Sequence, residues 1–592
     1  MLTSLVLLPV AAAIVVMLIP GRRKEIHLPL SIALSVMPLA LAGYLFWVFE
    51  PAAGFQYVDR VPWYEPWGID WYLGVDGISL PMIVLTTLLV PIALAASTTI
   101  TNRTKEFVIY TLLLEAGMIG AFLALAGYVF WVFEPAAGFQ YVDRVAWYEP
   151  WGIDWYLGID GISLPMVALT TLLVPIALAA STTITNRTKE FVMYTLLLEA
   201  GMIGAFLALD LFLFFVFFEA MLIPMYFIIG IWGTERRVYA AVKFFIYTAF
   251  GSALMLAAII GLALTYASQE GSASFALSDL AGLDLAVGTE RIFFAAFAIA
   301  FAIKVPLFPF HTWLPDAHVE APTAGSVLLA AVLLKLGTYG LLRYNLALFP
   351  DASVDAIPIM AILAVIGIIY GAVVAIVQPD LKKLVAYSSV SHLGFIVLGT
   401  FALTSGGLQG AVIQNVNHGL TTGALFLLVG MIYDRRHTKK ISDFGGLQKT
   451  VPLLAGFFLF MTFASIGLPG LNGFVGEFLV LIGSYPALPS LTVIAAFGVV
   501  LAAIYLLWAY ERVFTGVPDK EENSVLSDLS GREIALLVPI AVLIVVIGLY
   551  PKLLLDKITP STEAVLDNIV EQTDFTIPEP GRIGDVFVAG GE

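Results

Sequence analysis

Ionisable side chains interrupt apolar runs that are long enough to cross a membrane. Lys304 follows RIFFAAFAIAFAI, and Glu219 lies within FLFFVFFEAMLIPMYF. Each charge would cost roughly 2.5 to 3.5 kcal/mol at mid-membrane if it stayed unpaired. The complete set within expected spans is Lys243, Lys304, Lys335, Glu115, Glu199, Glu219 and Glu477. Interhelical ion pairs would explain any one of them. The whole set, with both signs on separate helices, favours a hydrated path along which lysines and carboxylates exchange protons.

Two histidines extend this polar set. His392 lies in LVAYSSVSHLGF and His418 in VIQNVNHGLTTGALF. Because a neutral imidazole can pass a proton between its two nitrogens, both could bridge Lys335 toward Glu477. Simple interhelical hydrogen bonding is the alternative for each histidine.

Prolines and glycines predict two broken helices beside these charges. Pro306 and Pro309 follow Lys304, and GLPGLNGFV precedes Glu477. An interrupted helix at membrane depth is tolerated where it lines protein or water, and it is typical of ion sites in transporters. The two breaks therefore predict two related half-units.

The segment FHTWLPDAHVE carries possible metal ligands, namely His311, Asp316, His318 and Glu320. Their spacing matches no common zinc pattern, and the flanking prolines prevent one continuous helical face, so a structural loop is favoured. The chain has no cysteine, which excludes iron–sulfur clusters and disulfides. No nucleotide-binding fingerprint occurs, so we expect no cofactor in this chain.

The elements that position these residues must be transmembrane helices. Of the 592 residues, 60% are hydrophobic and 12% charged, which predicts an all-α polytopic membrane protein with the lipid bilayer as a partner. Most Lys and Arg residues fall in alternate loops, so these loops should face the cytoplasm and both termini the outside. The net charge of −15 argues against nucleic acid as a partner. Hydropathy predicts sixteen spans, at about 2–20, 28–49, 79–98, 107–133, 163–182, 191–209, 211–232, 239–267, 292–308, 323–342, 357–378, 384–404, 408–433, 451–484, 489–510 and 534–550.

Residues 39–122 are repeated, with six differences, as residues 123–206. Each copy contains an aromatic segment, such as VPWYEPWGIDWYLGVDG, which we expect to be an external loop, and each adds two crossings. The sixteen spans are thus fourteen plus a duplicated pair. We expect one copy at the periphery, with at most one of Glu115 and Glu199 inside the helix bundle. The predicted segments are N-terminal spans (1–38), the two copies (39–122 and 123–206), a first core (207–343), a second core (344–511), and a loop, last span and external tail (512–592).

The motifs FLFFVFFEAMLIPMYF, AIKVPLFPFHTWLPDAHVEAPT, DLKKLVAYSSVSHLGF and GLPGLNGFVGEF together resemble the antiporter-like subunit M family of the bacterial proton-pumping NADH:quinone oxidoreductase, complex I. The resemblance implies two inverted five-helix repeats in the bacterial inner membrane. It also implies that NADH, FMN, iron–sulfur clusters and quinone are held by partner subunits, and that sister antiporter-like subunits are neighbours.

The resemblance further implies roles for individual residues. Glu219 would pair with Lys304 at the broken helix, and Lys335 would be the central lysine. His392 and His418 would relay protons to the terminal Glu477. Lys243 also matches a family lysine, although its place near a helix end suits a snorkelling role equally well.

Two other functions stay open from the sequence. A subunit of a multisubunit cation/proton antiporter or of a membrane-bound hydrogenase would share much of this motif set, although Glu477 disfavours the antiporter. A membrane scaffold without its own pathway is the third reading, which the row of buried charges opposes.

Overall fold

The computed structural model describes residues 2–19, 24–48, 56–64, 69–75, 83, 87, 130, 133–518 and 520–578. The chain divides into two compact units, residues 1–133 and 134–592, which are described separately below.

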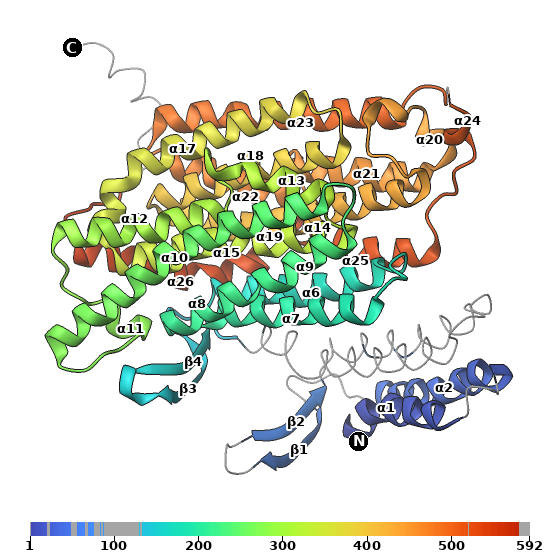
Figure 1. Ribbon diagram of the computed structural model, residues 1–592, viewed down its shortest axis with the longest axis horizontal. Helices are drawn as coiled ribbons and strands as arrows, with labels where there is room; N and C mark the ends of the chain where they lie inside the picture. Colours follow the sequence, from blue (N-terminus) through green and yellow to red (C-terminus); the bar gives the residue numbers. More distant parts are fainter. Residues whose placement is uncertain are drawn as a thin grey trace. The chain divides into compact units, whose positions relative to one another are not determined.

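The first unit contains two helices that contact each other, α1 (Leu2–Leu18) and α2 (Lys24–Val48). They are followed by an antiparallel pair of strands, β1 (Gln56–Tyr64) and β2 (Ile69–Val75) (Figure 1). Most of the rest of the first repeat copy, including Glu115, lies outside the described residues.

The second unit begins with a hairpin of β3 (Gln140–Tyr148) and β4 (Ile153–Ile159). The aromatic segment that we expected to be an external loop thus has a regular hairpin structure in this copy. Alternating aromatic and β-branched residues favour strands, and the EPWG sequence between them supplies the turn, with Gly152 in the left-handed region. The equivalent strands β1 and β2 pair in the same register.

Helices form the remainder of the second unit (Figure 1). Ten helical stretches in residues 163–549 are long and apolar enough to cross a membrane. They are α6 (Ser163–Ala180), α7 (Thr188–Leu207), α8 and α9 (Leu211–Ala220 and Leu222–Trp232), α10 (Arg237–Glu270), α14 to α16 (Thr323–Leu348), α17 (Pro350–Ile376), α18 (Leu381–Phe401), α19 (Ser405–Arg436), α23 (Pro489–Phe514) and α25 (Gly531–Leu549). The total of sixteen spans stays a prediction, because most of residues 49–132 fall outside the described ranges.

Two further apolar segments are interrupted, as the prolines predicted. Helix α12 (Val287–Lys304) ends at Lys304 itself, and after a short turn α13 (Trp313–Glu320) begins. Helices α21 (Pro452–Ser465) and α22 (Asn472–Ser484) are likewise separated by the glycine-rich LPGL segment.

The span that carries Lys335 is irregular in a way that the sequence did not indicate. Helix α15 (Lys335–Gly340) lies between two π-helical segments, Leu329–Leu333 and Leu341–Asn345. Gly337 is required here, because a Cβ atom would lie 2.7 Å from the backbone nitrogen of Val305. The glycine lets α15 approach the end of α12, where Lys304 lies.

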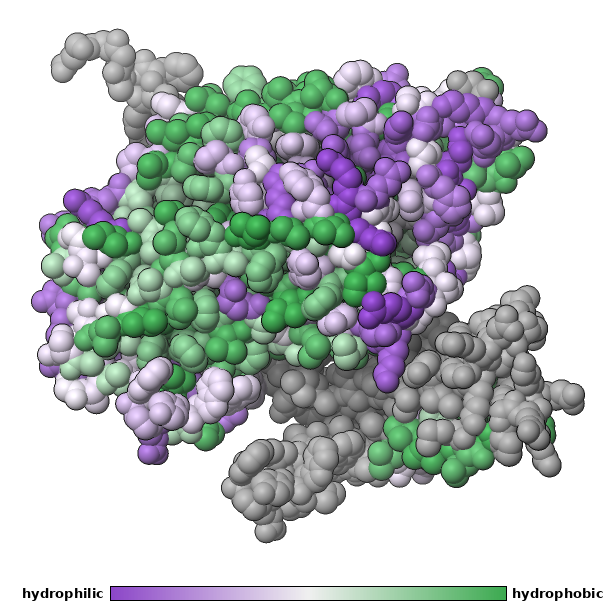
Figure 2. Space-filling model, viewed as in Figure 1, coloured by the Kyte–Doolittle hydropathy of each residue, from purple (hydrophilic) through white to green (hydrophobic). Residues whose placement is uncertain are grey.

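Hydrophilic side chains gather at one end of the second unit, where α20 (Leu447–Thr450) and α24 (Glu521–Ser524) lie, while apolar side chains cover much of the helical surface (Figure 2). The loops at this end, residues 181–187, 233–236, 377–380, 437–446 and 515–530, include most of the cationic loops identified from the sequence. We call it the cation-rich end.

The chain after α25, which we expected to lead into an external tail, continues as a further helix. Residues Lys552–Gln572 form helix α26, which contacts α16, α17, α19 and α25. Its apolar residues recur at helical spacing and are buried, for example Leu554, Ile558 and Ile569. An amphipathic helix of this kind covers the bundle with its apolar face.

Candidate functional site

Glu219 and Lys304 lie close together without forming a closed ion pair. Glu219 is in the last turn of α8, and Lys304, which is 1% exposed, ends α12. The two charges interact electrostatically, but Lys304 Nζ and Glu219 Oε1 are both buried without a hydrogen-bond partner. The ammonium instead lies over the Phe218 ring, 4.8 Å from its centroid. The Lys304 ammonium is thus held by an aromatic ring and makes no hydrogen bond. This arrangement suits a charged group that changes its ionic partner.

Lys335 is completely buried and bonded on two sides. Its Nζ atom lies 2.5 Å from the carbonyl oxygen of Ala330, within the first π-helical segment, and 2.5 Å from Nδ1 of His418 on α19. The neighbouring Thr338 donates to the side chain of Asn415 at 2.6 Å. Helices α15 and α19 are thus joined by polar contacts at the level of Lys335.

The contacts continue from His418 to Glu477. The His418 and His392 rings lie 5.9 Å apart between centroids, and Nδ1 of His392 lies 2.7 Å from Oε1 of Glu477. Gln414 donates to the same carboxylate oxygen at 3.1 Å. Lys335, His418, His392 and Glu477 therefore form one buried row, which we call the relay.

The relay depends on close contact between α19 and α22. A Cβ atom at Gly476 would lie 2.1 Å from the side-chain oxygen of Gln414, so only glycine allows this spacing. The same interface is fixed by Asn417, which donates to the carbonyl of Asn472 at 2.7 Å where α22 begins. This contact ties the start of α22 to α19.

His318, the last of the accessory histidines, lies near the relay. It is fully buried, stacks on Phe426 at 4.5 Å, and has no hydrogen-bond partner at either nitrogen. Both Lys335 and Lys382 act on it electrostatically. His318 therefore lies within electrostatic range of the central lysine and of a second buried lysine.

The other accessory residues connect α10 to the segment after the break. Lys243 lies 2.8 Å from Asp316 Oδ2 and donates to the carbonyl of Thr312 at 2.8 Å. Lys243 therefore fixes the start of α13 rather than pointing freely to the membrane surface. His311 is 3% exposed and packs against the rings of Phe308 and Tyr370. Within the described part of the chain, His, Asp and Glu residues form no cluster of three that could hold a metal ion.

Glu199 is half-buried on α7, and no hydrogen bond or ion pair joins it to the relay residues in the described part of the chain. Its copy in the first unit, Glu115, cannot be compared, since it lies outside the described ranges.

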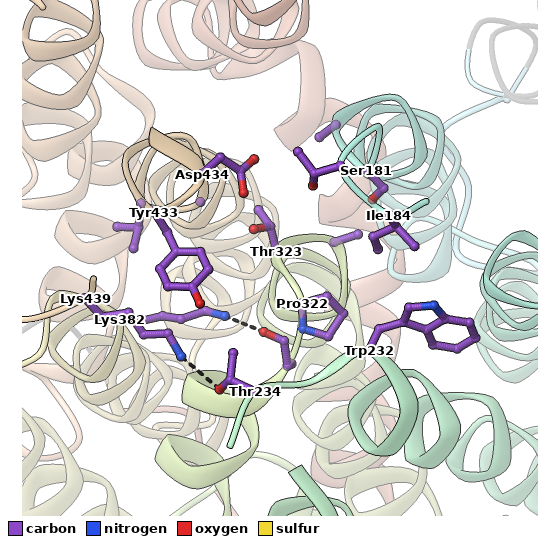
Figure 3. Close-up of a pocket in the computed structure, with 16 residues that line it drawn as sticks. Ser181, Ile184, Trp232, Thr234, Pro322, Thr323, Lys382, Tyr433, Asp434 and Lys439 are labelled. Carbon is purple, nitrogen blue, oxygen red and sulfur yellow. Dashed lines mark hydrogen bonds between the residues drawn. The ribbon is translucent and has the colours of Figure 1, made fainter. Parts of the chain in front are cut away.

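A cavity of about 150 Å³ lies at the cation-rich end, between the ends of α6, α9, α18 and α19 (Figure 3). Lys382 donates into the carbonyl of Ala321 at 2.5 Å, and Lys439 donates to Thr234 Oγ1 at 3.1 Å. Burial lowers the pKa of Lys439. Asp434 and Tyr433 complete the polar lining. The cavity is a place where water from the cation-rich side could reach Lys382.

Sequence reasoning missed three residues here. Lys382 and Arg343 were both assigned to loops, but they are 6% and 5% exposed. Arg343 is paired with Asp160, which also caps the start of α6. Tyr505, on α23, is fully buried with its hydroxyl 3.2 Å from Nε2 of His392. The sequence signal for Lys382 was Asp380, whose capping of α18 places Lys382 inside the first helical turn.

Comparisons with known proteins agree on one family. Residues 208–504 match the family described as NADH:quinone oxidoreductase/Mrp antiporter, TM, and residues 52–124 match the amino terminus of NADH-ubiquinone oxidoreductase chain 4. The NADH-quinone oxidoreductase subunit M of Rhodobacter capsulatus is 46% identical over 454 residues, which cover 75% of this chain and 87% of the relative.

Solved structures show the same relationship. A chain of respiratory complex I from Thermus thermophilus has a TM-score of 0.62 and 28% identity, with 96% of this chain and all of that chain covered. A chain of the Mrp complex from Dietzia has a TM-score of 0.65 and 25% identity, but only 51% of that chain is covered.

Proposed function

Because the chain belongs to the NADH-quinone oxidoreductase subunit M family, we propose that this membrane subunit of complex I moves protons through Glu219, Lys304 and the relay. The observation that carries this proposal is the row itself: Lys335 contacts His418, His392 contacts Glu477, and the two histidine rings lie 5.9 Å apart between centroids. Burying each of these ionisable groups in a membrane would cost free energy, and pairing or proton exchange with the others lowers that cost.

The geometry suggests how one proton would pass. Lys335 gives a proton to Nδ1 of His418, and the imidazole releases another from Nε2, which has no partner in the structure. His392 takes up that proton and gives one from Nδ1 to Oε1 of Glu477. Each imidazole ends neutral but with its hydrogen on the other nitrogen, so both rings must return to the starting tautomer before the row passes another proton.

Charge in the first cluster would control the start of this sequence. While Lys304 stays protonated beside Glu219, its charge is partly balanced. If Glu219 neutralised or moved away, the positive charge at Lys304 would repel a proton on Lys335 across the α12–α15 contact and favour its release. Redox chemistry in other subunits, which hold NADH, FMN, iron–sulfur clusters and quinone, would supply the energy, and sister antiporter-like subunits would be the membrane neighbours.

We also propose how the helices are arranged in the membrane. Two inverted five-helix repeats would each contain one broken helix, α12–α13 in the first and α21–α22 in the second. In a bacterial inner membrane, the cation-rich end would face the cytoplasm, and both termini would lie outside. The duplicated segment would raise fourteen spans to sixteen.

The Mrp-like fold keeps a cation/proton antiporter as the second candidate. The identity to subunit M over most of the chain favours the complex I assignment. Proton uptake driven by NADH, independent of sodium, separates the two in membrane vesicles.

Replacing Lys304 with alanine is expected to abolish proton pumping and strongly depress coupled quinone reduction while the complex still assembles. The reason is that Lys304 Nζ forms no hydrogen bond in the structure, so its loss removes a charge without breaking a polar contact between helices. The measurement is NADH-driven acidification of inverted membrane vesicles, with assembly checked on native gels. The matched control is Lys449→Ala, an exposed lysine on α20, which should pump normally. Full pumping in the Lys304 variant would refute the assignment.

A further inference from the structure

His392 lies between one carboxylate and two hydroxyl groups. Its Nδ1 atom contacts Glu477 at 2.7 Å. On the other side, Nε2 lies 3.2 Å from the hydroxyl of Tyr505 on α23 and 3.4 Å from that of Ser465 at the end of α21. These side chains are all buried, with Tyr505 at 0% and Ser465 at 4% exposure.

The two nitrogens of the His392 ring differ in the hydrogen bonds that they can form. An ionised carboxylate only accepts hydrogen bonds, so Nδ1 facing Glu477 carries a hydrogen. In the neutral ring Nε2 must then accept, and in the protonated ring it must donate. A hydroxyl group fits both states because it can turn from donor to acceptor, whereas a backbone N–H or carbonyl fits only one.

The position of His418 makes this second side important. Nδ1 of His418 is occupied by Lys335, and its Nε2 has no partner. Since Nδ1 of His392 is occupied by Glu477, a proton that leaves His418 has Nε2 of His392 as its available destination. The hydroxyl groups of Tyr505 and Ser465 lie at that atom.

We propose that Tyr505 and Ser465 are proton-path residues whose hydroxyl groups stabilise His392 in both protonation states. When the ring is neutral, a hydroxyl donates to Nε2. When the ring is protonated, the hydroxyl accepts from Nε2–H and turns its own hydrogen away from the ring. This inference rests on the relay of the proposed function and adds the groups that let His392 change state in a dry site.

The test uses the assembled complex in native membrane vesicles. Tyr505→Phe combined with Ser465→Ala removes both hydroxyls with little change of shape. We expect a roughly tenfold lower rate of NADH-driven proton pumping, because a buried Nε2 then lacks its partner in both states, and the loss costs the charged ring more than the neutral one. The solvent deuterium isotope effect on pumping should rise, which a purely structural defect would not cause. Ser465→Thr, which keeps the hydroxyl, should pump better than Ser465→Ala.

The matched control is Tyr510→Phe on the same helix, since Tyr510 packs against the rings of Phe514 and Phe458, 4.9 and 6.5 Å away between centroids. The His392→Ala variant tests the relay separately from the role of the two hydroxyl groups. If it abolishes pumping while the double variant pumps with the rate and isotope effect of the native protein, the hydroxyl inference is overturned and the relay stands. If His392→Ala itself pumps fully, the relay is wrong. Should the double variant fail to assemble, Tyr505→Phe alone decides, with a native rate and isotope effect counting against the proposal.

Discussion

Replacing Lys335 with methionine is expected to abolish proton pumping while leaving the helices of the second unit in place. Lys335 is fully buried at the head of the relay, 2.5 Å from Nδ1 of His418, and its ammonium is the group that we propose gives a proton to His418. Methionine has a similar length and fills the same space without a charge, so packing in α15 is retained. Removing a buried ammonium also removes its desolvation cost, which helps the variant to fold.

A second substitution at this position distinguishes charge from proton exchange. Lys335→Arg keeps a permanent positive charge but cannot release a proton, so it should also fail to pump. Acidification of inverted vesicles during NADH oxidation is the measurement, and native gels report assembly. Lys552→Met, at an exposed position on α26, is the matched control. Pumping at a normal rate by either Lys335 variant would show that Lys335 does not pass protons.

The relay residues could be predicted from the sequence because charge inside an apolar run is conspicuous and costly. Lys335, His392, His418 and Glu477 all lie in long apolar or small-residue segments, and the structure brings them into one row. The broken helices could also be predicted, since proline removes a backbone donor at a definite place. The Glu219–Lys304 pairing was predicted as a partnership, and the structure shows electrostatic proximity without a hydrogen bond.

Features that depend on contacts between distant segments could not be read from the sequence. Tyr505 is one of many aromatic residues, and its contact with His392 exists only because α23 packs on α18. Arg343 was assigned to a loop, because nothing near it in the sequence indicates its pairing with Asp160. The π-helical segments around Lys335 likewise arise from tertiary packing, since the local sequence is an ordinary helix former.

Asp160 ties the second copy of the repeat to the helix bundle. This residue lies in the second copy, caps α6 through Ser163, and forms a buried ion pair with Arg343. The contacts of α6 with α14 and α19 also come from the second copy. The first copy contains the equivalent Asp76, which lies outside the described residues.

Asp160→Ala is therefore expected to destabilise the protein by about 3 to 5 kcal/mol, because it leaves the Arg343 guanidinium buried without its carboxylate. Asp76→Ala, in an identical sequence context, is the matched control and should have little effect. Thermal unfolding of the detergent-solubilised complex, with assembly in membranes as a second readout, gives the comparison. Equal losses for the two variants would show that both copies form such a pair. A third outcome is that each single variant keeps its stability and only the double variant loses it. The two copies would then replace each other at the same place in the bundle. Residues 76–79 and 160–163 have the same sequence, so either aspartate could accept the hydrogen bond that Asp160 accepts from Ser163.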